Sequence, residues 1–389
     1  MPPWLSSIAA YSAGNGRTET ESWHKELTEM AKPEATHVII RTWLFPEDWQ
    51  ASNMDWLSES INFLVVNAVA PFLYVSRLDQ RIYWLYLFVA LLLSAWIFIH
   101  KGREKESVCP VTSLHRLKEF GRFCFPKEVY GHKSAKVDYL FFIINRIAFP
   151  WLIAPLIVGV TVVSHFSNLF FTQFSFLIGL MGHAGLADKI FFTLCSLVIM
   201  DAAFYVSHYL QHNVPVLWEF HKVHHSAEVL TPITVYRMHP VDDLLTGSLG
   251  SIALGFLAGL FQILYSEGLG LFTVAGLNIG LFAFYVFGYN LRHSHIWLTY
   301  HSVISHIFIS PAQHQMHHSN NPLHFNRNLG FIFAFWDWIA RTLYVPMQRE
   351  EIEFGIEDKN SRDYNSVQHL YWRPFIRAYK HLPRINAKK

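Results

Sequence analysis

The sequence predicts an all-α fold: an integral membrane helical bundle of about four to six transmembrane helices, with a cytosolic helical cap that holds a histidine-rich dimetal site. Three observations predict it. Of the 389 residues, 52% are hydrophobic and only 15% are charged, and the mean hydropathy is +0.20. The apolar residues fall into long runs, and eight histidines form three clusters at helical spacing. This composition is not typical of a soluble enzyme.

Six apolar runs are each close to the ~17–25 residues that cross a hydrocarbon core as a helix. They lie at about 61–76, 83–99, 139–162, 189–207, 244–264 and 269–288. A shorter apolar segment, 168–181, is expected to lie at the membrane interface or to re-enter the membrane. The first 55 residues contain no basic start followed by an apolar core, so we expect no cleavable signal and a first membrane helix that anchors the chain.

The charges predict which side of the membrane the histidines occupy. Residues 101–137 hold nine Lys or Arg against four Glu, which is the strongest positive-inside signal in the chain. A cytosolic 101–137 loop brings all three histidine clusters to the cytosolic side. The expected organisation is a polar N-terminal segment (1–55), a transmembrane hairpin with the basic loop (56–137), one membrane domain with the histidines (138–346) and a polar C-terminal tail (347–389).

The histidine clusters carry the chemistry. Residues three and four apart lie on one face of a helix, so each cluster directs its imidazoles to one side. The clusters are His208 and His212; His221, His224 and His225; and His314, His317 and His318. Four ligands satisfy a structural zinc ion, whereas eight histidines suit two metal ions. Three scattered cysteines exclude a Cys-based site and fit a reduced compartment.

The absence of a general base argues against metal-assisted hydrolysis. The peptidase motif HExxH does not occur, and no cluster has a glutamate next to its first histidine. Asp201, seven residues before His208, is a costly acid inside an apolar run. We expect Asp201 either to orient a metal ligand or to bond to a neighbouring helix. For Asp337 we expect either the same orienting role or helix capping or a salt bridge. The cluster chemistry therefore favours redox reactions with oxygen.

Several motifs occur in one order along residues 195–346. They are HYLQH, WEFHKVHH from Trp218, RMHP from Arg237, NLRHSH from Asn290, SPAQHQMHHS, NRNLG and FWDWIARTLYVP. Together they resemble the fatty acid hydroxylase and sterol desaturase superfamily of membrane-bound histidine-box enzymes. The resemblance implies a non-haem di-iron oxidoreductase, a monooxygenase or desaturase that uses O2 on an unactivated C–H bond of a lipid. It also implies that 138–346 is the catalytic domain.

The same resemblance implies the metal ligands. All eight clustered histidines match the family's three boxes, and His239, His293 and His295 lie where members supply additional ligands. The cofactors implied are two iron ions, for which zinc could substitute in purified protein. One departure occurs after the third box, where many members have an Asp and this chain has Asn326. An acid that could hold a ligand's second nitrogen is therefore lost.

Alternatives remain open at the level of the sequence. The substrate could be a sterol or a fatty acyl chain in lipid biosynthesis, and the outcome hydroxylation or desaturation. The same site could cleave an ether lipid, and a membrane transporter or metal-binding protein is the alternative from another class. The chain has no dinucleotide-binding or iron–sulfur motif. We therefore expect a separate electron donor, a reductase with a ferredoxin or cytochrome, for which the basic loop could be the docking surface, and no nucleic-acid partner.

Overall fold

The structure, a computed structural model, describes residues 69–105, 113–265, 269–356 and 361–381, together with residue 65. These residues form α-helices, short 3-10 helices and one two-stranded hairpin, so the predicted all-α class is confirmed. Three helical segments are long and apolar enough to cross a membrane, and a fourth, Trp84–His100, is apolar but shorter. The described part of the chain therefore contains three candidate spans and one shorter apolar helix.

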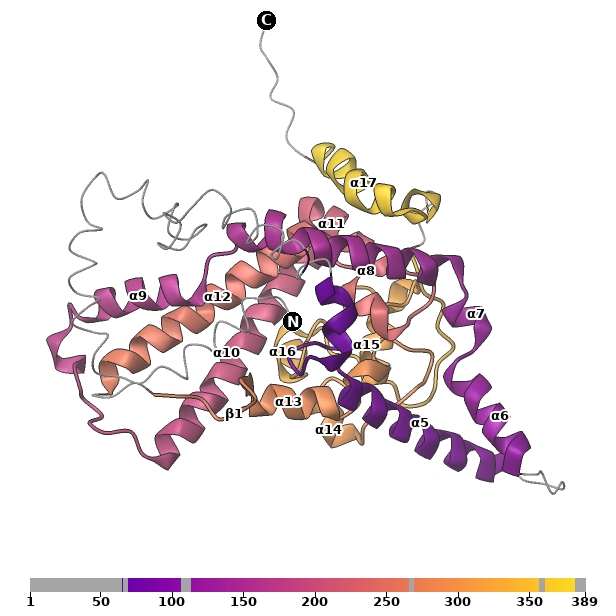
Figure 1. The fold of residues 1–389 in the computed structure, drawn as a ribbon, viewed down its shortest axis with the longest axis horizontal. Helices are drawn as coiled ribbons and strands as arrows, with labels where there is room; N and C mark the ends of the chain where they lie inside the picture. Colours follow the sequence, from indigo (N-terminus) through magenta and orange to yellow (C-terminus); the bar gives the residue numbers. More distant parts are fainter. Residues whose placement is uncertain (1–64, 66–68, 106–112, 266–268, 357–360, 382–389) are drawn as a thin grey trace, which may run out of the picture.

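The long apolar helices pack through small residues. Helix α9 (Val160–Phe171) follows the 3-10 helix η3 (Ala154–Leu156), and it lies along α12 (Pro240–Leu264) (Figure 1). A Cβ at Gly255 of α12 would lie 2.6 Å from the Cβ of Val163, and one at Gly259 would lie 2.5 Å from the Cβ of Ser167. Only glycine permits this approach, as in other membrane helix pairs.

Helix α10 (Leu186–Asn213) connects the apolar bundle to the histidines. It packs against α12, where the Ser207 and Thr246 hydroxyl oxygens lie 2.8 Å apart. Pro215 ends α10, because the residue before a proline is disfavoured in a helix, and the same proline begins α11 (Pro215–His225). The turn between them returns the chain across the end of α10, and α17 (Val367–Tyr379) covers α11 (Figure 1).

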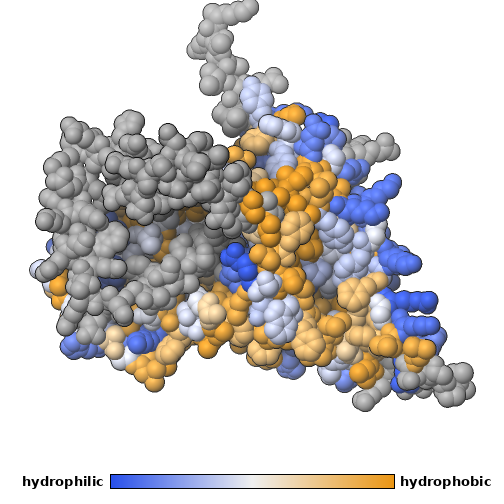
Figure 2. Space-filling model, in the orientation of Figure 1, coloured by the Kyte–Doolittle hydropathy of each residue, from blue (hydrophilic) through white to orange (hydrophobic). Residues whose placement is uncertain are grey.

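The first part of the described chain surrounds the other side of the bundle. Its elements are η2 (Ala70–Ser76), α5 (Trp84–Lys105), α6 (Ser113–Cys124), α7 (Lys127–Tyr130) and α8 (Lys133–Leu152). Figure 2 shows an apolar band over the region of α5 and α8, with hydrophilic side chains along the edge near α6 and α7. Phe88 and Leu92 of α5 and Leu140 of α8 are each about half exposed, which fits helices in contact with lipid.

The predicted span 139–162 is wrong, because the chain breaks within it. Pro150 lies in the last turn of α8, and Pro155 begins η3 at residues 154–156. A proline removes a backbone donor and blocks the preceding turn. One apolar run therefore becomes two helices, α8 and α9, which run in different directions (Figure 1).

The predicted span 269–288 is also wrong. It consists of the hairpin β1 (Thr273–Val274) and β2 (Leu277–Asn278), followed by the short helix α13 (Ile279–Val286). Ala275 and Gly276 have φ values of 44° and 84°. Two consecutive residues with positive φ form the tight turn that suits a two-residue hairpin, so the run cannot continue as one helix.

The remaining elements form the cap around the ends of α10 and α12. They are η5 (Pro232–Tyr236), η6 (Tyr289–Leu291), α14 (Ser302–Ile307), α15 (Pro311–His317), η7 (Pro322–His324), α16 (Phe335–Ala340) and η8 (Ser361–Tyr364). The short apolar segment 168–181 includes the 3-10 helix η4 (Ser175–Leu177) and bonds through Gly179 N–H to Ile263 O at the other end of α12. Its position at an interface remains a prediction. Most residues of the 61–76 run, like the N-terminal segment 1–55, lie outside the described residues.

Candidate metal centre

Three helices carry the clustered histidines to one place. His208 and His212 lie in the last turns of α10, the second cluster lies on α11, and the third ends α15. Helix α15 begins sharply because Ser310 caps it, with its hydroxyl accepting from Gln313 N–H and the Gln313 side chain accepting from Ser310 N–H. These local signals fix where each helix begins and which face carries its imidazoles.

The structure sorts the histidines into two groups. The five-histidine group consists of His208, His212, His221, His225 and His317, and the four-histidine group consists of His224, His293, His314 and His318. Within each group, one ring nitrogen of every histidine lies within 4.8 Å of the others. Neighbours in sequence diverge: His224 and His225 join different groups, as do His317 and His318. The predicted dimetal site is therefore divided into two adjacent histidine groups.

The nitrogens of the four-histidine group converge on a common point. The Nε2 atom of His293 lies 3.4 Å from that of His224 and 3.2 Å from that of His314, which lies 3.2 Å from that of His318. A ring nitrogen has one proton or one lone pair, so hydrogen bonds alone cannot satisfy this chain of contacts. Nitrogens about 2.1 Å from one metal ion would lie about 3.0–3.4 Å apart. The spacing fits a metal ion.

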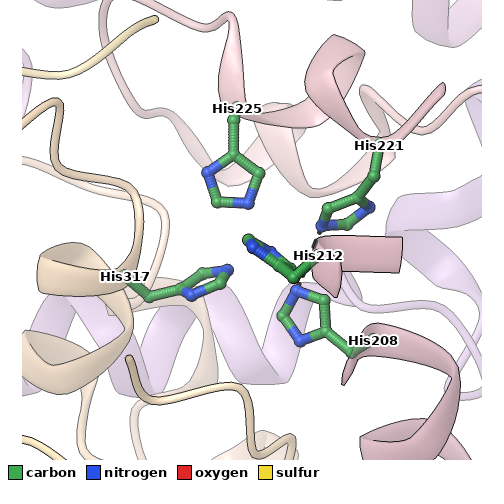
Figure 3. A group of neighbouring side chains, drawn as sticks. All are labelled: His208, His212, His221, His225 and His317. Carbon is green, nitrogen blue, oxygen red and sulfur yellow. Dashed lines mark hydrogen bonds between the residues drawn. The ribbon is translucent and has the colours of Figure 1, made fainter. Parts of the chain in front are cut away.

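The five-histidine group has the same character. Figure 3 shows its rings turned toward a shared centre from α10, α11 and α15, and the Nε2 atoms of His208 and His221 lie 3.1 Å apart. The Nε2 atoms of His212, His225 and His317 are buried without any hydrogen-bond partner. Buried polar atoms are rarely left unpaired, so these nitrogens also fit metal ligation. No carboxylate of the described residues joins either group.

Burial keeps the histidines neutral, which is the form that binds a metal. It lowers the pKa of His224 to about 3 and is the main cause that holds the pKa of His221, His293 and His317 well below their usual value. The charges of neighbouring histidines lower these pKa values further. Both groups are therefore ready to bind a cation at neutral pH without losing a proton.

The metal-free protein is expected to lose stability as the pH falls from about 7 toward 4. The unfolded chain protonates these histidines near pH 6.5, about their ordinary pKa, whereas the folded protein keeps them neutral to much lower pH. The unfolded state then binds more protons, so stability falls by up to about 1.4 kcal/mol per pH unit for each group. Thermal unfolding followed by circular dichroism at a series of pH values tests this. A melting temperature that stays constant from pH 8 to 4.5 would contradict it.

The segment Asn326–Leu329 holds the second ring nitrogen of three histidines. His208 Nδ1 lies 2.7 Å from Leu329 O, His212 Nδ1 lies 3.2 Å from Asn326 Oδ1, and His317 Nδ1 lies 2.9 Å from Arg327 O. An Nδ1–H that donates to oxygen leaves the Nε2 lone pair for a metal. The Asn326 carbonyl oxygen therefore takes the place in which the sequence analysis found an acid missing.

Two buried carboxylates fix this segment. Asp337 accepts from the backbone N–H of Leu329 and Gly330 at 2.8 and 2.7 Å. Asp201 accepts from the N–H groups of Ile332 and Phe333 at 2.7 and 3.0 Å and from the Trp336 indole at 3.0 Å. Asp201 therefore bonds to α16 and the chain before it, which is the second of its two expected roles, and not to a histidine ring.

Asp242 lies behind one of the grouped histidines, and the sequence analysis did not single it out. Its Oδ2 atom lies 3.5 Å from His221 Nδ1, and both side chains are buried. A carboxylate behind a ligating imidazole orients the ring and increases its basicity. The available signal was its place three residues after His239, in the first turn of α12.

Two of the three additional histidines lie outside both groups. His239 caps α12, with Nδ1 accepting from Val241 N–H at 3.1 Å, and its Nε2 lies 3.2 Å from Tyr371 O. His295 places Nε2 2.7 Å from Phe123 O. Both rings are engaged with the backbone, so we leave His239 and His295 out of the candidate ligands. His293 lies within the four-histidine group.

Comparisons with known proteins agree with this geometry. Residues 192–342, which include every histidine of both groups, match the family model for fatty acid hydroxylase. The ornithine lipid hydroxylase OlsE of Rhizobium tropici is 29% identical over 168 residues, which cover 43% of this chain and 46% of the relative. The alkylglycerol monooxygenase of Caenorhabditis elegans is 24% identical over 179 residues, 45% of this chain and 32% of the relative. The chain thus spans less than half the length of either relative. No solved structure matches it.

Proposed function

Residues 192–342 belong to the fatty acid hydroxylase superfamily, and from that premise we propose that the protein is a membrane-bound, O2-dependent lipid hydroxylase with one iron ion in each histidine group. The observation that carries the proposal is the pair of buried, neutral histidine groups at the end of a membrane helix. Imidazole ligands suit iron. Zinc would also fit the nitrogens, but it has no redox chemistry.

Bound iron would supply the oxygen and electron chemistry that the amino-acid side chains lack. The side chains do the rest. The Asn326–Leu329 segment fixes the ring orientation of three ligands, and Asp242 lies behind a fourth, His221. The apolar bundle excludes water from the reacting carbon.

The net reaction inserts one atom of O2 into a C–H bond and releases the other as water. It consumes two electrons and two protons, which requires an electron donor. We propose a separate reductase with a ferredoxin or a cytochrome. Helix α6 presents Arg116, Lys118 and Arg122 in the described part of the basic 101–137 region, and such a surface would attract an acidic partner.

An apolar cavity in the bundle would hold the lipid chain. It lies between α9, α10, α12 and α13, and Leu197, Met200, Leu254 and Leu281 line it. Met200 precedes His208 by eight residues of the same helix, or about 12 Å. The cavity therefore supports a lipid with an apolar chain as substrate. We further propose that the helices are embedded as a multi-pass bundle with the histidines on the cytosolic side.

An 18O2 experiment tests the function. Purified protein loaded with iron, given a chemical reductant and a membrane lipid extract, is expected to yield a lipid with one 18O atom, and metal analysis is expected to find about two iron ions per chain. Protein that binds no iron, or that leaves every lipid unlabelled, would sink the proposal. Movement of metal ions across a vesicle membrane without any labelled lipid would favour a transporter.

Cleavage of an ether lipid is the second candidate, because one relative is named an alkylglycerol monooxygenase. Hydroxylation of the carbon beside the ether oxygen would give an unstable product that breaks into an alcohol and an aldehyde. Lipid mass spectrometry of cells without the protein separates the two functions. Accumulated ether lipids favour cleavage, whereas loss of a hydroxylated lipid favours the first proposal.

A further inference from the structure

Arg81 lies next to both segments that hold metal ligands. Its guanidinium carbon is 6.0 Å from the ring centre of Tyr289 and 5.8 Å from that of Phe331. Tyr289 precedes His293 by four residues, and Phe331 follows Leu329, whose carbonyl accepts from His208. Asn290 Nδ2 donates to Arg81 O at 3.0 Å, so the Arg81 backbone is tied to the first of these segments.

The Arg81 side chain has no anionic partner in the described part of the protein, and it hydrogen-bonds to the neutral Tyr285 hydroxyl. Its Nε is buried without a hydrogen-bond partner, and none of the described carboxylates pairs with it. Asp79, two residues away, is occupied by Arg77 at 2.9 Å and by Gln80 at 2.7 Å. A partly buried charge without an anionic partner is costly, and the described residues supply no anion at this position.

A second unpaired donor lies in the same cluster. Tyr236 is 4% exposed, and its hydroxyl is buried without a partner. The charge of Arg81 acts on the Tyr236 hydroxyl. Tyr285 and Tyr289 are further aromatic neighbours of Arg81. A guanidinium with an unpaired Nε donor and a hydroxyl without a partner together suit an oxygen-rich anionic group.

The aromatic cluster is continuous with the apolar cavity. Leu281, Tyr285 and Tyr289 are spaced four residues apart, and they belong to the same packed core as Leu197 and Met200 of the cavity wall. Leu281 and Tyr285 belong to α13, and Tyr289 begins η6 three residues after α13 ends. A lipid chain in the cavity would therefore place a polar end near Arg81, beside the four-histidine group.

We propose that Arg81, assisted by Tyr236, binds an anionic group of the lipid substrate, a carboxylate or a phosphate. Calling this lipid the substrate rests on the proposed function, but binding of the anionic lipid does not. Arg81 lies outside the residues that match the family model, whereas Tyr236 lies within them. Arginine suits this role because its fork of donors matches both anions.

Binding to metal-free protein in detergent tests the inference without any turnover. The probes are dioleoyl phosphatidic acid and oleate, their neutral counterparts dioleoylglycerol and oleyl alcohol, and inorganic phosphate. We expect the two anionic lipids to raise the melting temperature more than the neutral ones. In Arg81→Gln, their affinity should fall about ten- to hundredfold, the loss of one or two charge-assisted hydrogen bonds. Equal effects of anionic and neutral lipids, or unchanged affinity in Arg81→Gln, would overturn the proposal.

Matched variants separate binding from folding. Arg77→Gln removes an exposed arginine of the same loop, and we expect it to bind like the wild type. Without lipid, Arg81→Gln should melt at or above the wild-type temperature, because an unpaired charge is removed. A lower melting temperature would indicate a structural arginine and contradict the proposal. Tyr236→Phe provides a second variant with a smaller expected loss of affinity.

The source of the anion is decided by the phosphate probe. Inorganic phosphate that stabilises the protein as strongly as phosphatidic acid would overturn the assignment to a lipid. Because the protein carries no metal in these measurements, a failure to find iron would sink the proposed function and leave the anionic lipid site standing.

Discussion

Replacing His224 by alanine is expected to empty the four-histidine group and to leave the five-histidine group filled, whereas His225→Ala should weaken metal binding in the five-histidine group alone. The two residues are adjacent, but their imidazoles point into different groups. Metal analysis should fall from about two ions per chain to about one in His224→Ala, in which three of the four histidines remain. The fall should be smaller in His225→Ala, since four of five remain. Lipid hydroxylation should drop below detection in His224→Ala.

His295→Ala is the matched control. The sequence analysis named His295 with the ligands, but in the structure its ring bonds to Phe123 O and lies outside both groups. The His295→Ala variant should keep both metal ions. If His224→Ala and His225→Ala lost both ions together, or His295→Ala lost one, the division into two groups would be wrong. The comparison can be repeated with His317→Ala and His318→Ala, the other adjacent pair.

Asp201→Ala is expected to lower the melting temperature strongly and to reduce metal affinity. Asp201 accepts from three buried donors, Ile332 N–H, Phe333 N–H and the Trp336 indole. Each donor left without a partner costs about 1–3 kcal/mol. The released chain continues into Leu329, which holds the His208 ring, and loss of such support weakens a metal site about 10–100-fold. Thermal unfolding and metal titration measure the two effects.

Asp188→Ala, on the same helix, controls for the loss of a carboxylate. Asp188 accepts from Gly185 N–H and from the Tyr265 hydroxyl at the end of α10 far from the histidines. The Asp188→Ala variant should reduce thermal stability less than Asp201→Ala does, and it should leave metal affinity unchanged. Asp201→Asn, which keeps one side-chain oxygen, should lie between the alanine variant and the wild type. Wild-type metal affinity in Asp201→Ala would contradict a supporting role for this carboxylate.

The sequence alone was sufficient to predict those features that depend on residues close together in the chain. Spacings of three and four residues place His221, His224 and His225 on one face of any helix, and the structure has that helix. The apolar runs at 189–207 and 244–264 likewise became α10 and α12. Within 269–288, however, the left-handed turn at Ala275–Gly276 outweighed apolar character. Turn geometry there was a local signal that hydropathy alone does not register.

The sequence by itself determined that this is a helical membrane protein with three histidine clusters, because composition and helical periodicity act over a few residues. Only the tertiary structure decided how the clusters divide into two groups, and why His293 joins one while His239 and His295 bond to the backbone. The same holds for Asp242 behind His221 and for Arg81 beside Tyr289. These contacts depend on how helices far apart in the chain pack together, which no local pattern specifies.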